Sequence, residues 1–295
     1  MANRLLLSVE DLNDDTVHRI LDRAVMHAAR SVGPRDSGRP IVGLVFLEAS
    51  LRTRIGFAAA ALRLGWHSID VAERRSSPTS KPESWQDTLR TVAGYADVLI
   101  ARIGHPLSRA ELAHWLRRPL LNGGDSGPAA EHPSQALIDL FAMEQLGPVT
   151  DLRIAVCGDL RMRAVRSLLR LLARTPPRSL VLITDPALAD DEPSPAPLLP
   201  ITEHRPPWDL ADIDVLYVAG IPYGALPEPG RSRLRVGATA LAELRRDSIV
   251  LSPLPVIDEI HPDVRSDGRL KMFQQSDQGL YVRMALLEEL VSPLP

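Results

Sequence analysis

The sequence predicts an α/β protein of two domains, each built on a doubly wound parallel sheet. Short apolar runs alternate with segments of helical spacing along the whole chain, which is the pattern of parallel strands covered by helices on both faces. The chain has 295 residues, and chains of this length usually divide into more than one core. The alternation restarts after Gly147-Pro148, so we predict a first domain over residues 1–147 and a second over 148–276.

The first half begins with apolar positions at helical spacing over residues 9–29, with Ser8 as a suitable N-cap. An apolar run at 41–46 predicts a buried strand. The same two signals predict the other elements of this half, which are helices at 53–64, 84–95, 108–116 and 133–146 and strands at 68–71, 98–100 and 120–121.

The second half begins with a strand at 153–157 and a helix at 163–173. Further strands are predicted at 179–184, 214–218 and 248–251, loops at 191–207 and 220–237, and a last helix at 278–290. Ligands of open parallel sheets bind beyond the carboxyl ends of the strands. The loops that follow the strands are therefore where functional residues are expected.

Composition excludes several classes of function. The formal net charge of −3 is not that of a nucleic-acid-binding protein. A single cysteine, Cys157, excludes an internal disulfide and a cysteine-rich metal site, and no other metal-ligand pattern is found, so no metal is expected. No apolar run approaches the ~20 residues of a membrane span, and the N-terminus lacks the pattern of a signal peptide. We expect a cytoplasmic protein.

One segment between a strand and a helix has the composition of a phosphate site. It is Glu48-Ala49-Ser50-Leu51-Arg52-Thr53-Arg54. A helix N-terminus offers free N–H groups and a positive dipole end. Ser50 and Thr53 add hydroxyl donors, and Arg52 adds a charge-assisted bond of ~1.5–3 kcal/mol. From these residues alone, a capped helix with exposed arginines remains an equal alternative.

This segment resembles the Ser-Thr-Arg-Thr-Arg motif of the aspartate and ornithine carbamoyltransferases, and the overall pattern resembles the aspartate branch more closely. Further segments resemble the family's motifs in the same order, namely Asn122-Gly123-Gly124-Asp125 with His132-Pro133-Ser134-Gln135, Gly158-Asp159-Leu160-Arg161, Ser252-Pro253-Leu254-Pro255 with Asp258-Glu259-Ile260, and Phe273-Gln274-Gln275 with Gly279-Leu280. The resemblance implies the carbamoyltransferase fold. In that fold the first domain binds carbamoyl phosphate, the second binds an amino-acid-like amine acceptor, and a C-terminal helix (277–295) packs back on the first domain.

The resemblance also implies roles for individual residues and no cofactor. The implied carbamoyl-phosphate-binding residues are Ser50, Leu51, Arg52, Thr53, Lys81, Arg102, His132, Gln135 and Leu254, of which Arg52, Thr53, Lys81, Arg102, His132 and Gln135 would act in catalysis. Thr53, Arg102 and His132 would donate to the carbonyl oxygen, where each donor is worth ~2.7–4 kcal/mol of barrier. In the family the arginine directly precedes His-Pro, whereas here two residues separate Arg102 from His105-Pro106.

Lys81 is one of only two lysines in an arginine-rich chain. The family has a lysine on this loop that reaches into the active site of the neighbouring subunit. The resemblance therefore implies a homotrimer with shared active sites.

The acceptor side departs from the family. Arg163 aligns with the arginine that binds the α-carboxylate, but Gly220 and Pro222 stand where the aspartate branch has an arginine and a glutamine. A buried carboxylate without a cationic partner costs several kcal/mol. Unless Arg231, Arg233 or Arg235 replaces the lost arginine, we predict an acceptor other than aspartate, held by Arg163, Leu254 and the segment of Gly220 and Pro222.

Three alternatives remain open. The chain could be an ordinary aspartate carbamoyltransferase of pyrimidine synthesis, or a catalytically silent homologue that serves as a structural subunit. A dinucleotide-dependent oxidoreductase fits the α/β pattern, but the turn at 158–163 lacks the glycines that approach a pyrophosphate.

Overall fold

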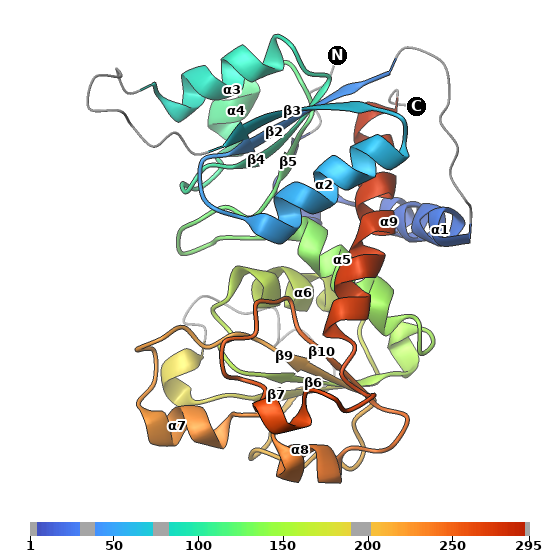
Figure 1. Cartoon of the computed structure of the whole chain (residues 1–295), viewed down its shortest axis with the longest axis vertical. Coiled ribbons are helices and arrows are strands. Elements are labelled where there is room, and N and C mark those ends of the chain that lie inside the picture. The colour runs from blue at the N-terminus through green and yellow to red at the C-terminus, as the bar shows by residue number, and fades with distance from the viewer. Residues whose placement is uncertain (1–4, 30–38, 73–82, 190–201, 293–295) are drawn as a thin grey trace. The chain divides into compact units, whose positions relative to one another are not determined.

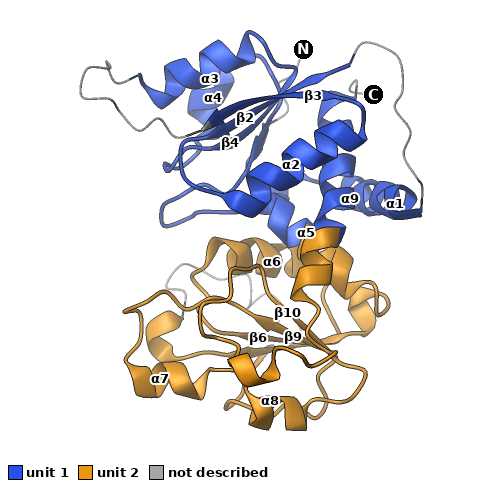
Figure 2. Cartoon of the chain, in the orientation of Figure 1, with its two compact units in different colours: residues 1–137, 278–295 blue, residues 138–277 orange. Residues whose placement is uncertain are grey.

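The computed structural model describes residues 5–29, 39–72, 83–189 and 202–292 (Figure 1). It forms two compact units (Figure 2). Unit 1 comprises residues 1–137 and 278–295, and unit 2 comprises residues 138–277. The divisions fall within helices α5 (Pro133–Met143) and α9 (Met272–Val291), whereas the sequence placed the domain boundaries at 147 and 276.

Unit 1 is built on a five-stranded parallel sheet of order β1-β5-β4-β2-β3. Its elements are β1 Leu5–Leu6, α1 Asp14–Ala29, β2 Ile41–Phe46, α2 Leu51–Arg63, β3 His67–Ala72, α3 Trp85–Ala93, β4 Val98–Arg102, α4 Arg109–Trp115, β5 Leu120–Asn122 and the start of α5.

The helices of unit 1 cover both faces of this sheet. Apolar residues of α3 and α4 form a buried cluster with the strands on one face, and α2 lies on the opposite face (Figure 1). The C-terminal part of α9 packs in unit 1 beside α1, where Glu289 accepts from Arg19 and Arg23 at 3.3 and 3.1 Å. The prediction of a C-terminal helix packed on the first domain is confirmed.

Unit 2 repeats the architecture with a five-stranded parallel sheet of order β10-β9-β6-β7-β8. Its elements are β6 Arg153–Cys157, α6 Arg163–Arg174, β7 Ser179–Ile183, β8 Thr202–His204, β9 Val215–Val218, α7 Glu228–Arg233, α8 Ala238–Glu243 and β10 Ile249–Leu251. The α7–α8 region packs on one face of the sheet in a second apolar cluster. The predicted α/β class with two doubly wound parallel sheets is confirmed.

Among the described strands and α-helices, four were not predicted from the sequence, and each is short. Strand β8 consists of Thr-Glu-His and lies at the edge of its sheet, where pairing with β7 rather than hydrophobicity stabilises it. Helix α7 has the sequence Glu-Pro-Gly-Arg-Ser-Arg, whose proline and glycine are typical of loops. The others are β1 and α8, and α9 begins at Met272 instead of the predicted 278.

Among the residues that the structure describes, no helix has the length and apolarity that crossing a membrane requires.

Candidate functional site

The strand order of unit 1 reverses between β2 and β4, and the predicted phosphate segment follows β2 at that point. The carboxyl end of β4 is Arg102, whose carbonyl accepts hydrogen bonds from the backbone N–H groups of Leu47 (2.9 Å) and Glu48 (3.2 Å). The two strand ends are therefore tied together where open parallel sheets bind their ligands.

The N-terminus of α2 is open to a ligand. Ser50 is its N-cap residue, with an extended backbone, but its hydroxyl makes no capping hydrogen bond to the helix. The free N–H groups of a first helical turn bind anions when no side chain satisfies them. Leu51 is 70% exposed, so solvent reaches this turn.

Arg52 follows in the first turn of α2 and is half-buried. It has no hydrogen bond or ion pair to another residue in the described parts of the chain, and burial lowers the pKa of its guanidinium. A partly desolvated cation without a carboxylate partner beside free helix N–H groups is an arrangement that suits a phosphate.

The structure brings Thr53 and His132 together. The Thr53 hydroxyl lies 3.3 Å from Nε2 of His132, and the hydroxyl of Ser134 lies 3.3 Å from Nδ1. His132 is 7% and Thr53 5% exposed. Gln135, half-buried, stands three residues further on at the start of α5. These groups offer hydrogen-bond donors next to the phosphate segment, which is what a developing oxyanion requires.

Arg102 is paired with Glu48, a residue that sequence analysis did not assign. Arg102 donates from Nε at 3.1 Å and from a terminal nitrogen to the same carboxylate oxygen of Glu48, and the Ser126 hydroxyl donates to the other oxygen at 3.0 Å. Glu48 thus orients the guanidinium at the carboxyl end of β4. The acidic residue at the start of the phosphate segment was the signal that could have revealed this.

The Asn-Gly-Gly-Asp segment makes hydrogen bonds that position the backbone next to His132. Asn122, fully buried, donates to the carbonyls of Leu7 (3.0 Å) and Glu131 (3.3 Å) and accepts from the N–H of Gly124 (2.8 Å). Asp125 accepts from the N–H of Glu131 at 2.7 Å. These bonds fix the residue next to His132, so the motif acts through backbone geometry.

Unit 2 gathers its predicted residues at one edge of its sheet. Arg163 begins α6 after β6, Gly220 and Pro222 follow β9, and Leu254 follows β10, and these three strands are neighbours in the order β10-β9-β6. Gly158, with φ +116°, allows the turn after β6 to approach β9, because a Cβ there would lie 2.4 Å from the carbonyl oxygen of Ala219.

A buried polar chain supports Leu254, whose backbone has a left-handed φ of 56°. Its N–H donates to the Ser252 hydroxyl at 3.3 Å, and the N–H of Ser252 donates to Gln275 at 3.0 Å. Gln275 donates to Asp139 at 2.6 Å, and Tyr217 donates to the same carboxylate at 2.8 Å. Burial, with the Asp139 charge, raises the pKa of Tyr217, so its hydroxyl stays protonated and remains a donor.

The three arginines that could replace the missing acceptor arginine are all occupied. Arg231, 6% exposed, binds the carboxylate of Asp258 and donates to the carbonyls of Ile221 (2.8 Å) and Pro222 (2.9 Å). Arg235 shares Asp258 at 2.8 Å. Arg233 pairs with Asp185 at 3.0 Å and is largely exposed.

Among these arginines, Arg231 has the clearest structural role. It anchors the loop that contains Gly220 and Pro222, and sequence analysis did not foresee this.

Lys81 lies outside the described residues. In the part of the chain that the structure describes, no three histidine, cysteine or acidic residues are grouped to hold a metal.

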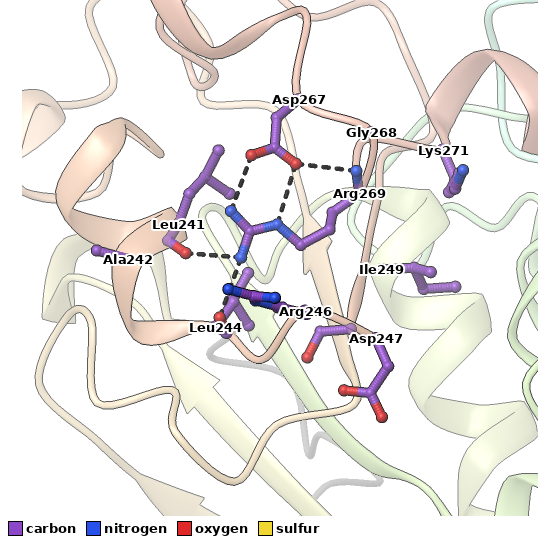
Figure 3. A pocket seen from close by; sticks show the side chains of 11 residues that line it. Leu241, Ala242, Leu244, Arg246, Asp247, Ile249, Asp267, Gly268, Arg269 and Lys271 are labelled. Atoms are coloured by element: carbon purple, nitrogen blue, oxygen red, sulfur yellow. Dashed lines mark hydrogen bonds and ion pairs between the residues drawn. The ribbon is translucent and has the colours of Figure 1, made fainter.

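A pocket of about 580 Å³ lies at the amino end of β10 (Figure 3), and no predicted site residue lines it. Arg269 is one of the lining residues, and its guanidinium binds Asp267 and the carbonyls of Leu241 (2.7 Å) and Leu244 (3.0 Å). These bonds give Arg269 a structural role.

Known proteins match this chain along nearly its whole length. Residues 4–145 match the family model "Aspartate/ornithine carbamoyltransferase, carbamoyl-P binding domain". The aspartate carbamoyltransferase catalytic subunit of Alkaliphilus oremlandii is 36% identical over 97% of this chain and 90% of its own. That of Methanospirillum hungatei is 34% identical over 97% and 99%.

Solved structures agree with the sequence comparisons. The catalytic subunit of M. jannaschii aspartate transcarbamoylase superposes with a TM-score of 0.83 at 31% identity, covering 99% of this chain and 98% of that one. The Trypanosoma cruzi enzyme in complex with carbamoyl phosphate superposes with a TM-score of 0.86 at 28% identity, covering 98% and 96%. With these motifs, this fold and these relatives, the chain belongs to the aspartate/ornithine carbamoyltransferase family.

Proposed function

We propose that this protein is an enzyme that transfers the carbamoyl group of carbamoyl phosphate to the amine of an amino-acid-like acceptor and releases phosphate. The observation that supports this most directly is the N-terminus of α2. There a helix end without a side-chain cap, an Arg52 that has no carboxylate partner among the described residues, and the Thr53–His132 contact adjoin one another. A dianionic leaving group and a developing oxyanion need these two kinds of donor.

The roles follow the chemistry of the reaction. The neutral amine attacks the planar carbonyl carbon, the C–O bond to phosphate breaks, and the amine proton is taken up by the departing phosphate, which leaves as hydrogen phosphate. We assign the phosphate to Ser50, Leu51, Arg52 and Thr53 and the carbonyl oxygen to Thr53, Arg102 and His132. Gln135 and the backbone carbonyl of Leu254 are assigned to the carbamoyl NH₂. No covalent intermediate is needed, because alignment of two bound reactants supplies much of the acceleration.

Calorimetry with carbamoyl phosphate and with a phosphonate mimic tests this assignment. We expect binding by the intact protein and a loss of at least tenfold in Arg52→Met, since a charge-assisted bond is worth ~1.5–3 kcal/mol. Asn13→Ala, an exposed change in the same unit, is the matched control. Binding of carbamoyl phosphate without transfer to any amine would favour the alternative of a catalytically silent homologue.

For the acceptor, we propose an amino acid with a smaller or less acidic side chain than aspartate. Gly220 and Pro222 offer no charge, and Arg231 and Arg235 are paired with Asp258. Arg163, at the start of α6, is assigned to the α-carboxylate. The competing proposal is aspartate itself in pyrimidine synthesis, and one similar Trypanosoma cruzi structure is a complex with aspartate and phosphate.

A screen of amino acids as acceptors with carbamoyl phosphate separates these two proposals. We expect turnover of a neutral or small acceptor and weak turnover of aspartate. Restoring the charge with Gly220→Arg should raise the efficiency with aspartate, while Pro227→Arg, at an exposed position of the same segment, should not. Aspartate turning over efficiently in the unmodified protein would refute the altered specificity.

We also propose a homotrimer in which Lys81 reaches a neighbouring active site. One face of α2 supports an oligomer, because Leu51, Ile55 and Leu62 lie within about 40° of one another on the helix and are 70%, 57% and 68% exposed. Light scattering of Ile55→Glu should show dissociation, and Val25→Glu on α1, 55% exposed, is the control. A monomeric unmodified protein would refute the proposal.

The cytoplasmic location stays a prediction.

A further inference from the structure

A further arginine of unit 1 lies beside the phosphate segment, although sequence analysis gave it no role. Arg283 of α9 is 5% exposed. Its guanidinium packs against Gly56 in the second turn of α2, where an added Cβ would lie 2.6 Å from Nη1, and it lies 5.7 Å from the ring centroid of Phe57. The absence of a side chain at Gly56 is what lets the cation approach α2.

Arg283 has no counter-charge in the described parts of the chain. Its buried Nε lacks any hydrogen-bond partner, and no ion pair joins its guanidinium to another described residue. Arg231 is buried to the same degree but is paired with Asp258. A buried charge without a partner is strongly unfavourable, so Arg283 differs from a structural arginine of the Arg231 kind.

The charge of Arg283 nevertheless persists at neutral pH. Burial, and then the neighbouring charge of Arg52, lowers its pKa to about 10. The same helix therefore has two guanidinium groups without a bound carboxylate, Arg52 in its first turn and Arg283 against its second, in addition to the positive end of its dipole. An anion at the N-terminus of α2 would relieve the repulsion between them.

We propose that Arg283 is a positioning residue for the phosphate site, whose buried charge strengthens the binding of a phosphate dianion at the N-terminus of α2 through its field. This inference rests on the proposed function, which places phosphate there. It adds a residue on the C-terminal helix to the determinants of anion affinity.

The experiment compares Arg283→Met, Arg283→Lys and the unmodified protein by calorimetry with inorganic phosphate and by thermal melting with and without phosphate. We expect about tenfold weaker phosphate binding in Arg283→Met, the order for one unit charge acting over several ångströms in partly buried surroundings. Arg283→Lys keeps the charge and should remain within about threefold of the unmodified protein. Arg231→Met, the matched buried arginine, should melt earlier but bind phosphate normally.

Melting gives a second, independent readout. Since an unpaired buried charge is removed, the unliganded Arg283→Met protein should not melt earlier, while its stabilisation by phosphate should shrink. A lower melting temperature with unchanged phosphate affinity would show a purely structural role and overturn the inference. Should Arg283→Met fail to fold, Arg283→Gln is measured with the same expectations. An unmodified protein that binds no phosphate would refute the proposed function itself. Equal phosphate affinity in the unmodified protein and in Arg283→Met would refute only the role of Arg283.

Discussion

Replacing Asn122 with alanine should both destabilise unit 1 and misplace His132. The side chain is fully buried and makes three hydrogen bonds, two as a donor to the carbonyls of Leu7 and Glu131 and one as an acceptor from the N–H of Gly124. Asn122→Ala removes the side-chain partner of all three backbone groups. Two of them belong to the segment that leads into His132.

The magnitude follows from these three groups. A buried backbone group that loses its partner costs ~1–3 kcal/mol, so three groups cost ~3–9 kcal/mol. The truncation leaves room for a water, which restores part of the bonding. We therefore expect a loss near the lower end, about 3–4 kcal/mol in the free energy of unfolding. A displacement of His132 by about 1 Å should also lower kcat/KM on the order of 10²-fold.

Urea denaturation followed by linear extrapolation measures the first effect, and initial rates of carbamoyl transfer measure the second. Asn13→Ala is the control, because the exposed Asn13 accepts one hydrogen bond, from the N–H of Thr16 at 2.8 Å, and its loss should cost about 1 kcal/mol. Both residues lie in unit 1, so the same transition reports them. A stability loss for Asn122→Ala no larger than that of the control, with unchanged kcat/KM, would refute the reasoning.

Three further predictions concern unit 2. Arg231→Met should lower the free energy of unfolding, measured by urea denaturation, by about 2–3 kcal/mol. This is below the ~3–5 kcal/mol expected when a fully buried ion pair is broken, because Asp258 still pairs with Arg235. No measurable loss would contradict the structural role of Arg231. The hydrogen bond from Arg269 lowers the pKa of Asp267 to about 2 from 3.8. The stabilisation that ionised Asp267 provides is therefore full above pH ~4 and is lost as the pH falls towards 2. Asp267→Asn should melt earlier than the unmodified protein at pH 7, and this difference in melting temperature should disappear in acid. A difference that does not depend on pH would exclude this linkage. Burial raises the pKa of Cys157 to about 12, so a thiol reagent at pH 8 should label it only after unfolding, and rapid labelling of the folded protein would contradict its burial.

Much of the fold followed from local sequence signals. The strands at 41–46, 98–102 and 153–157 are almost wholly buried, and buried parallel strands appear in a sequence as continuous apolar runs. The elements that were missed, such as β8 and α7, have polar or helix-breaking sequences. Their conformation depends on a neighbouring strand or on the Arg231–Asp258 ion pair, and local propensity does not report such partners.

The candidate site divides in the same way. The sequence by itself predicted a phosphate site at Ser50–Thr53, because such a site at a helix N-terminus uses residues adjacent in the chain, whereas the role of His132 was predicted from its resemblance to a family motif. Only the tertiary structure revealed that Glu48 pairs with Arg102, that Arg231 and Arg235 share Asp258, and that Arg283 reaches Gly56 from a helix more than 200 residues away. Charge pairing and burial are set by distances between residues remote in sequence, and these distances exist only in the folded chain.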